Sequence, residues 1–134
     1  MNPLQPVTPR EGPGARGHYS PGMRAGNLLF VSGQIAIAPG GESLAGADLE
    51  TQSRQALANL RAVVEAAGAT LDRVARVTVY LAEPDGWPVF NRVYAGFFGD
   101  HKPARSVVPV NPFHGGFKVE VDAIAVLDDR QPAA

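Results

Sequence analysis

The sequence predicts an α+β domain in which a mixed β-sheet carries two helices on one face. The first observation is the order of the periodic segments, β-β-α-β-α-β-β, in which apolar residues recur at strand or at helix spacing. The second is that two helices of similar weight accompany five or six strands, which favours a single layer of helices. The third is a length of 134 residues with 45% apolar side chains, which suits one folded domain.

The first elements are a β-hairpin and a long helix. Two short β-like runs in the segment HYSPGMRAGNLLFVSGQIAIAPGG flank the turn signal Ala25-Gly26-Asn27. Between Asp48 and Gly68 apolar and small residues recur at helical spacing, with Asp48 as the N-cap and Gly68 just beyond the last turn. The residues of this stripe are Leu49, Ser53, Ala56, Leu57, Leu60, Val63, Val64 and Ala67.

A strand, a second helix and two closing strands complete the domain. The segment VARVTVYLA is β-branched, and Asp85 stands where it can cap the second helix. The stretch HKPARSVVPVNPFHGGFKVEVDAIAV predicts two strands joined by a glycine-rich turn and set side by side. Pro109 has no amide proton, so its strand is expected at an edge or a bulge. The residues that recur at helical spacing in the second helix are Trp87, Phe90, Val93, Tyr94, Phe97 and Phe98, and of these Trp87, Phe90, Phe97 and Phe98 are interpreted as core.

The last strand indicates that the second face of the sheet is also covered. Val119, Val121 and Ala123 line one side of this strand, while Glu120, Asp122, Ile124 and Val126 line the other. Both sides carry apolar area, and the helices can cover only one of them. Self-association over the bare face is the physical inference.

Composition divides the chain and excludes several functions. Residues 1–17 hold four prolines and three glycines and predict a disordered tail, 18–128 form the domain, and 129–134 form a polar tail. A net charge of −1 without a basic cluster argues against nucleic-acid binding, and no apolar run is long enough to span a membrane. The chain has no cysteine and its start lacks the apolar core of a signal peptide, so a cytoplasmic location is expected.

The search for reactive motifs leaves one pair of residues. His18, His101 and His114 are scattered singly, so no metal site and no cofactor are expected. Arg105 begins a strand of valines, where a guanidinium is costly to bury unless an anion meets it. Either Glu120 or Asp122 forms a structural ion pair with it, or a ligand carboxylate binds there.

Five segments in order resemble the Rid family of enamine/imine deaminases (the YjgF/YER057c/UK114 group). They are HYSPG, NLLFVSGQI, DLETQSRQALANLRAVVEAAG, FNRVYAGFFGDHKPARS and VEVDAIAV. The resemblance covers about 110 of the 134 residues. It implies a chorismate-mutase-like fold, a homotrimer and a ligand cleft at each subunit boundary.

The resemblance also implies roles for individual residues. Arg105 resembles the arginine that grips a substrate carboxylate, and Glu120 the carboxylate that activates water. Tyr19, Ser32, Gly33 and Asn91 resemble further contacts in the cleft, and Val107 follows Arg105 on the same strand face. His114, in the unusual turn NPFHGG, is either a solvated turn residue or a contact to substrate.

The function implied is that of a 2-iminobutanoate/2-iminopropanoate deaminase. Such an enzyme hydrolyses small 2-aminoacrylate-like enamines and 2-imino acids to 2-keto acids and ammonia, without metal or organic cofactor, because the C=N bond is already electrophilic. Two alternatives stay open. One is a deaminase of a larger enamine such as 2-aminomuconate, and the other is a trimer that binds ligands without turnover or acts as a ribonuclease.

Overall fold

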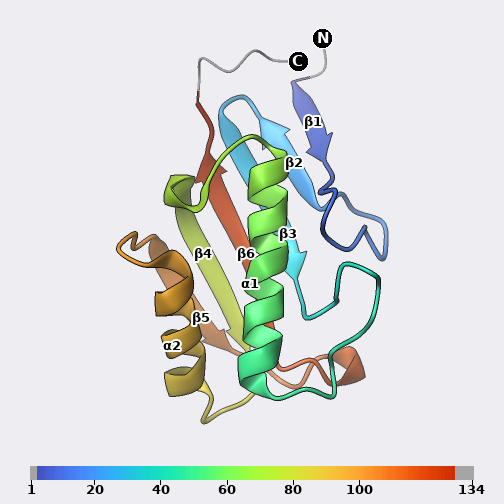
Figure 1. Ribbon diagram of the computed structural model, residues 1–134, viewed down its shortest axis with the longest axis vertical. Coiled ribbons are helices and arrows are strands. Elements are labelled where there is room, and N and C mark those ends of the chain that lie inside the picture. Colours follow the sequence, from blue (N-terminus) through green and yellow to red (C-terminus); the bar gives the residue numbers. More distant parts are fainter. Residues whose placement is uncertain (1–2, 129–134) are drawn as a thin grey trace.

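The computed structural model describes residues 3–128, apart from the side chain of His114. One six-stranded sheet has the order β1-β2-β3-β6-β4-β5 (Figure 1). The predicted element order is confirmed from the first hairpin onward. The strands are β1 (Leu4–Val7), β2 (Gly22–Ala25), β3 (Leu28–Gln34), β4 (Val74–Leu81), β5 (Ala104–Pro109) and β6 (Val119–Val126), the helices are α1 (Leu49–Ala66) and α2 (Trp87–Phe98), and two short 3-10 turns cover Leu71–Arg73 and His114–Gly116.

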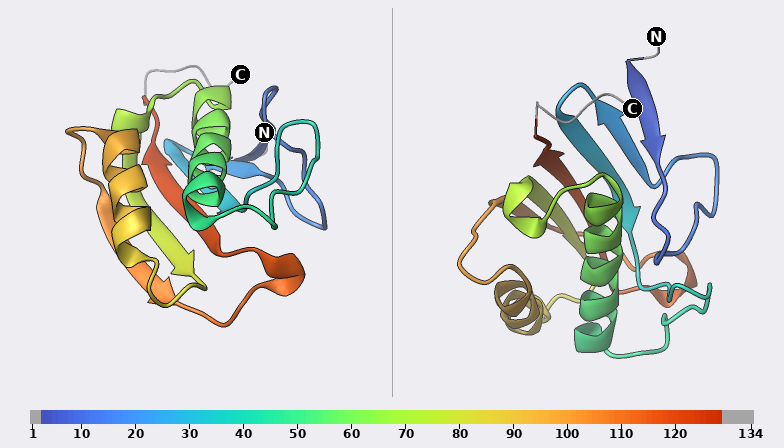
Figure 2. Two further views of the ribbon diagram at one scale, coloured as in Figure 1. Left: turned by 60° about the horizontal axis from the view of Figure 1, so that its bottom comes forward. Right: turned by 45° about the horizontal axis from the view of Figure 1, so that its top comes forward.

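Both helices pack on the same face of the sheet, as predicted (Figure 2). Asp48 caps α1 by accepting a hydrogen bond from the Thr51 amide at 2.9 Å. The apolar stripe of α1 lies against alternate residues of β3 and β6, which point toward the helices because strand side chains alternate between faces. The core includes Leu29, Val31, Leu57, Leu60, Val63, Val64, Val77, Val79, Phe90, Val119 and Val121.

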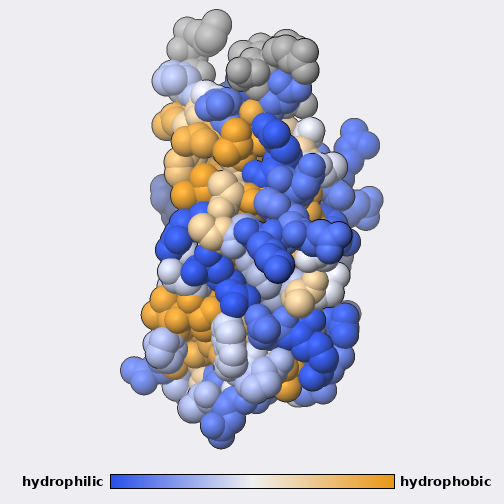
Figure 3. All heavy atoms as spheres, turned by 90° about the vertical axis from the view of Figure 1, so that its left-hand side faces the viewer, coloured by the Kyte–Doolittle hydropathy of each residue, from blue (hydrophilic) through white to orange (hydrophobic). Residues whose placement is uncertain are grey.

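The opposite face of the sheet is not covered within the protomer. Phe30 and Val108, which point to this face, are 42% and 37% exposed. Ile124 and Val126 of β6 are half-buried beside them. Viewed from the side of α2 and β5, the surface shows hydrophobic residues gathered in an upper and a lower area (Figure 3). The bare apolar area predicted from the last strand is therefore present.

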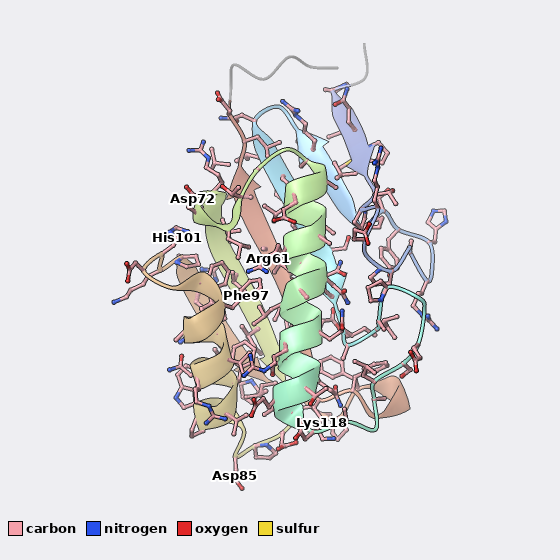
Figure 4. All side chains as sticks on the ribbon, viewed as in Figure 1. Arg61, Asp72, Asp85, Phe97, His101 and Lys118 are labelled. Carbon is pink, nitrogen blue, oxygen red and sulfur yellow. The ribbon has the colours of Figure 1, made fainter. Side chains whose placement is uncertain are left out.

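The start of α2 differs from the prediction. Gly86, rather than Asp85, is the N-cap residue, and no side chain caps the helix. Asp85 is exposed and points away from the body of the molecule (Figure 4). Pro88 lies in the first turn and has no amide proton, so one of the donors that a cap would satisfy is absent.

The strands of Arg105 and Glu120 are not neighbours, which corrects the prediction that they lie side by side. β4 lies between them, parallel to β5 and antiparallel to β6. The chain leaves β4 through α2, and this crossover places β5 parallel to β4 on its outer side. β5 is therefore an edge strand, which agrees with the expectation from Pro109.

The N-terminal segment contains an ordered strand, where the sequence predicts a disordered tail. Leu4–Val7 pair in antiparallel register with Gly22–Ala25. The outer edge of β2 offers unpaired backbone groups, and these hold a segment whose composition alone predicts disorder. The predicted C-terminal tail, 129–134, lies outside the described residues. Among the described residues, no helix is long and apolar enough to cross a membrane.

The contact between Gly22 and α1 yields a stability prediction. A Cβ atom added at Gly22 would lie 2.6 Å from Cγ1 of Val63, which is fully buried. We expect Gly22→Ala to lower the free energy of unfolding by about 1–3 kcal/mol through overpacking. Urea unfolding at one fixed protein concentration measures this change.

Gly96→Ala is the matched control for Gly22→Ala. A Cβ at Gly96, on α2, meets no atom within 4 Å, and alanine is favoured over glycine in a helix by roughly 0.5–1 kcal/mol. Equal unfolding midpoints for the two variants would contradict the packing described here.

Candidate active site

Arg105 is held by α2 and not by an acidic side chain. It lies opposite Val77 of β4 and therefore points to the helix-covered face. Its Nη1 donates a hydrogen bond to Oδ1 of Asn91 at 3.0 Å. Its guanidinium carbon lies 4.8 Å from the ring centre of Trp87 and 4.6 Å from that of Tyr94, within the range of cation–π attraction.

A cavity adjoins this guanidinium. It measures about 410 Å³ and is lined by Asn91, Tyr94, Lys102 and Arg105, among others. Asp122 accepts a hydrogen bond from the Tyr80 hydroxyl at 3.1 Å instead of pairing with Arg105. Within residues 3–128 Arg105 makes no ion pair, so the alternative of a structural ion pair with Glu120 or Asp122 is wrong for the protomer.

Glu120 lies in a different cavity, on the other face of the sheet. This cavity measures about 360 Å³, and the predicted residues Tyr19, Ser32, Gly33 and Glu120 all line it. A Cβ atom at Gly33 would occupy the position of the Glu120 carboxylate. Only glycine therefore leaves room for this side chain where it lies.

Burial disfavours the charged form of Glu120. It raises the pKa of this carboxyl above its ordinary range, and the nearby charge of Asp122 raises it further. A carboxyl group with a raised pKa is suited both to accept a proton and to return it.

Tyr19 and Ser32 line the Glu120 cavity and form hydrogen bonds with the neighbouring backbone. The Ser32 hydroxyl donates to the Ser20 carbonyl at 2.6 Å, and the Ser32 amide donates to the Pro21 carbonyl at 2.9 Å. The Tyr19 hydroxyl accepts a hydrogen bond from the Arg16 amide at 3.2 Å, and Tyr19 as a whole residue is 47% exposed. These contacts fix the partly exposed ring of Tyr19 in the same cavity as Glu120.

The predicted site residues thus form two groups that one protomer does not bring together. Asn91, Arg105 and, farther along β5, Val107 belong to the helix-covered side. Tyr19, Ser32, Gly33 and Glu120 belong to the open side. The backbone of His114 lies in the turn His114–Gly116, and its side chain lies outside the described part of the structure.

Sequence reasoning missed the aromatic partners of Arg105 and an arginine of the Glu120 cavity. Trp87, interpreted as a core residue, is 42% exposed and stacks on Arg105. Trp87, Asn91 and Tyr94 recur at helical spacing, and this signal was available in the sequence. Burial raises the pKa of Tyr94 to about 12, and its hydroxyl is buried without a hydrogen-bond partner. Arg16, which was not singled out, lines the Glu120 cavity.

The described residues offer no metal site. Among them, no group of three His, Asp or Glu side chains is placed to hold a metal ion.

Comparison with known proteins places the chain among close relatives. The model of the family described as Endoribonuclease L-PSP matches residues 10–127. Protein HMF1 of Saccharomyces cerevisiae is 39% identical, covering 94% of this chain and 97% of its own. A RutC family protein of Pyrococcus horikoshii, PH0854, is 43% identical over 81% of this chain and 86% of its own.

Solved structures agree with these sequence matches. The crystal structure of Escherichia coli TdcF with bound serine has a TM-score of 0.86 and 35% identity, covering 92% of this chain and 99% of that one. TdcF is provisionally named a reactive intermediate deaminase. The E. coli YjgF gene product has a TM-score of 0.85 and 36% identity, covering 91% and 98%. The chain therefore belongs to the Endoribonuclease L-PSP family, the YjgF/RutC group that its five sequence segments resemble.

Proposed function

We propose that this chain is a cytoplasmic deaminase that hydrolyses 2-imino acids and their enamine tautomers to 2-keto acids and ammonia. The observation that carries the proposal is a guanidinium, Arg105, that faces a cavity and is held by neutral groups. Such a group binds a small carboxylate with charge-assisted hydrogen bonds. The name of TdcF as a reactive intermediate deaminase, and the serine bound to it, support a small amino-acid-like substrate.

The chemistry needs Arg105 and Glu120 at one substrate. Arg105 holds the carboxylate, which fixes the adjacent C=N carbon for attack by water. Glu120 accepts a proton from that water as the new C–O bond forms. The proton then passes to nitrogen, which gives a carbinolamine. As its C–N bond breaks, Glu120 takes the hydroxyl proton and returns it to the leaving nitrogen, so the products are ammonia and a 2-keto acid. No redox change or cofactor enters this balance.

A second copy of the chain is needed to join the two groups. Arg105 and Glu120 point to opposite faces of one sheet, and β4 separates their strands. The open face beside Glu120 carries exposed apolar residues, including Phe30. We propose that a homotrimer buries this face and that Arg105 of one protomer meets Glu120 of its neighbour.

The family description as an endoribonuclease suggests another activity, but the charge of this chain does not favour it. A net charge of −1 supplies little attraction for a phosphate backbone. The alternative of a larger enamine substrate rests on the unusual sequence of the NPFHGG turn, which contains His114.

Substitution of the two central residues tests the proposal. Arg105→Ala is expected to lower kcat/KM for 2-iminobutanoate about 10- to 100-fold, through the loss of charge-assisted hydrogen bonds. Glu120→Gln is expected to lower kcat about 10²- to 10⁴-fold, through the loss of the general base. The measurement is keto-acid release from imine generated in situ by an amino-acid oxidase.

The exposed Arg54, which pairs with Glu50 on α1, provides the control Arg54→Ala, for which wild-type rates are expected. A wild-type protein that fails to exceed spontaneous hydrolysis would remove the enzymatic proposal.

Mixed trimers test whether the site is shared between protomers. Co-expressed Arg105→Ala and Glu120→Gln chains form trimers in which each mixed assembly restores one of its three sites. Random mixing should then recover about one quarter of wild-type activity, as expected for a closed ring of head-to-tail interfaces. Activity that stays at the level of the separate variants would place both residues in one protomer's site.

The raised pKa of Glu120 has a consequence for stability. The folded protein binds this proton more tightly than the unfolded chain, so the contribution of Glu120 to stability falls as the pH rises through the raised pKa. Glu120→Gln should therefore raise the unfolding temperature at neutral pH. The gain should vanish below the ordinary carboxyl value of 4.5. Thermal unfolding across pH, beside the exposed-site variant Glu65→Gln, measures it, and a gain that persists unchanged at acid pH would refute this cause.

A further inference from the structure

The Glu120 cavity contains a second arginine that the proposed reaction does not use. Arg16 lines it together with Tyr19, Ser32, Gly33 and Glu120. It belongs to the segment that the sequence predicts to be a disordered tail. Pairing of β1 with β2 fixes one end of this segment, and the hydrogen bond from the Arg16 amide to Tyr19 fixes the other.

The guanidinium of Arg16 is available to a ligand. Its side chain makes one long hydrogen bond, from Nη1 to the Gly41 carbonyl at 3.4 Å. A guanidinium has five N–H donors, so most remain unused. Within residues 3–128 Arg16 forms no ion pair, and it is not among the groups that shift the pKa of Glu120.

The charges of the cavity restrict what can bind there. Glu120 and Asp122 point to the same face, and each opposes the entry of another anion. A substrate with a single carboxylate is already neutralised by Arg105, so a second cation would have no acid group to bind. A substrate with two carboxylates needs one, because its second acid group would otherwise enter a cavity that Glu120 lines, with Asp122 nearby on the same face of the sheet.

We propose that Arg16 binds a second, distal carboxylate of the substrate, so that the preferred substrates are dicarboxylic 2-imino acids. This inference rests on the proposed deaminase function and names its substrate class. Arg105 holds the carboxylate next to the C=N bond, and the rest of the molecule extends into the Glu120 cavity toward Arg16. A volume of about 360 Å³ lies at the small end of ligand pockets and suits a diacid of few carbons. The reaction is the same hydrolysis and needs no further reactant.

Two other roles for Arg16 make different predictions. A plain surface arginine would affect no substrate. An anchor of the loop, acting through Gly41 and Tyr19, would affect substrates with one and with two carboxylates alike. Only a contact to a second carboxylate affects one class and spares the other.

The experiment compares imines derived from 2-aminobutanoate and from aspartate, each generated in situ by a suitable oxidase. Arg16→Gln is expected to lower kcat/KM for the aspartate-derived imine about 10- to 100-fold, mainly through KM, and to leave the 2-aminobutanoate-derived imine nearly unchanged. Arg16→Lys should restore part of the loss, because it keeps the charge without the planar guanidinium. Arg10→Gln, an exposed position in the same segment outside this cavity, is the matched control and should match wild type.

The outcomes separate the inference from the function on which it rests. Equal losses for both imines, or no loss for either, overturn the role of Arg16 while the deaminase proposal stands. Wild-type protein that hydrolyses neither imine overturns the deaminase proposal. Calorimetric binding of succinate and butanoate then decides on Arg16 separately. Tighter binding of succinate, lost in Arg16→Gln, supports the inference, and equal binding of the two acids refutes it.

Discussion

The site depends on how one positive charge is held. Arg105 is positioned by Asn91, Trp87 and Tyr94, all on α2, and none of these groups carries a negative charge. An acidic partner would hold the guanidinium equally well but would neutralise it. Neutral partners fix its orientation and leave its charge for a ligand. An amide acceptor and two aromatic faces therefore leave the positive charge of Arg105 available to a ligand, whereas an ion pair of the same geometry would neutralise it.

The alternation of strand side chains then determines the architecture of the whole site. Arg105 shares its face with Val77, and Glu120 points to the opposite face with Asp122. No change of rotamer brings two such groups together across a sheet. A chemistry that needs both is therefore a property of an assembly and not of the protomer. The same open face that carries Glu120 also carries exposed apolar residues, which the proposed assembly would cover.

Local sequence signals predicted most helices and strands, but the pairing of strands and the contacts between distant segments could not be predicted from them. The cap at Asp48 and the apolar stripes of both helices follow from short-range spacing. The neighbours of β5 do not, because the crossover through α2 sets them. Likewise, strand β1 exists because β2 offers an edge, which no property of residues 4–7 reveals. The separation of Arg105 from Glu120 is a result of such long-range pairing, so the sequence singles out the two residues but does not reveal that they lie on opposite faces of the sheet.

The electrostatics of the Glu120 cavity connect the N-terminal segment to the chemistry. Burial already disfavours the charge on Glu120, and Asp122 adds to this effect. A bound dianion would raise the pKa of Glu120 further and weaken it as a base, because like charges oppose ionisation. A cation at the distal end of the substrate opposes this shift, and Arg16 is the arginine that lines the cavity. In the proposed site, Arg16 therefore binds the second acid group and offsets the charge that this group brings into the cavity.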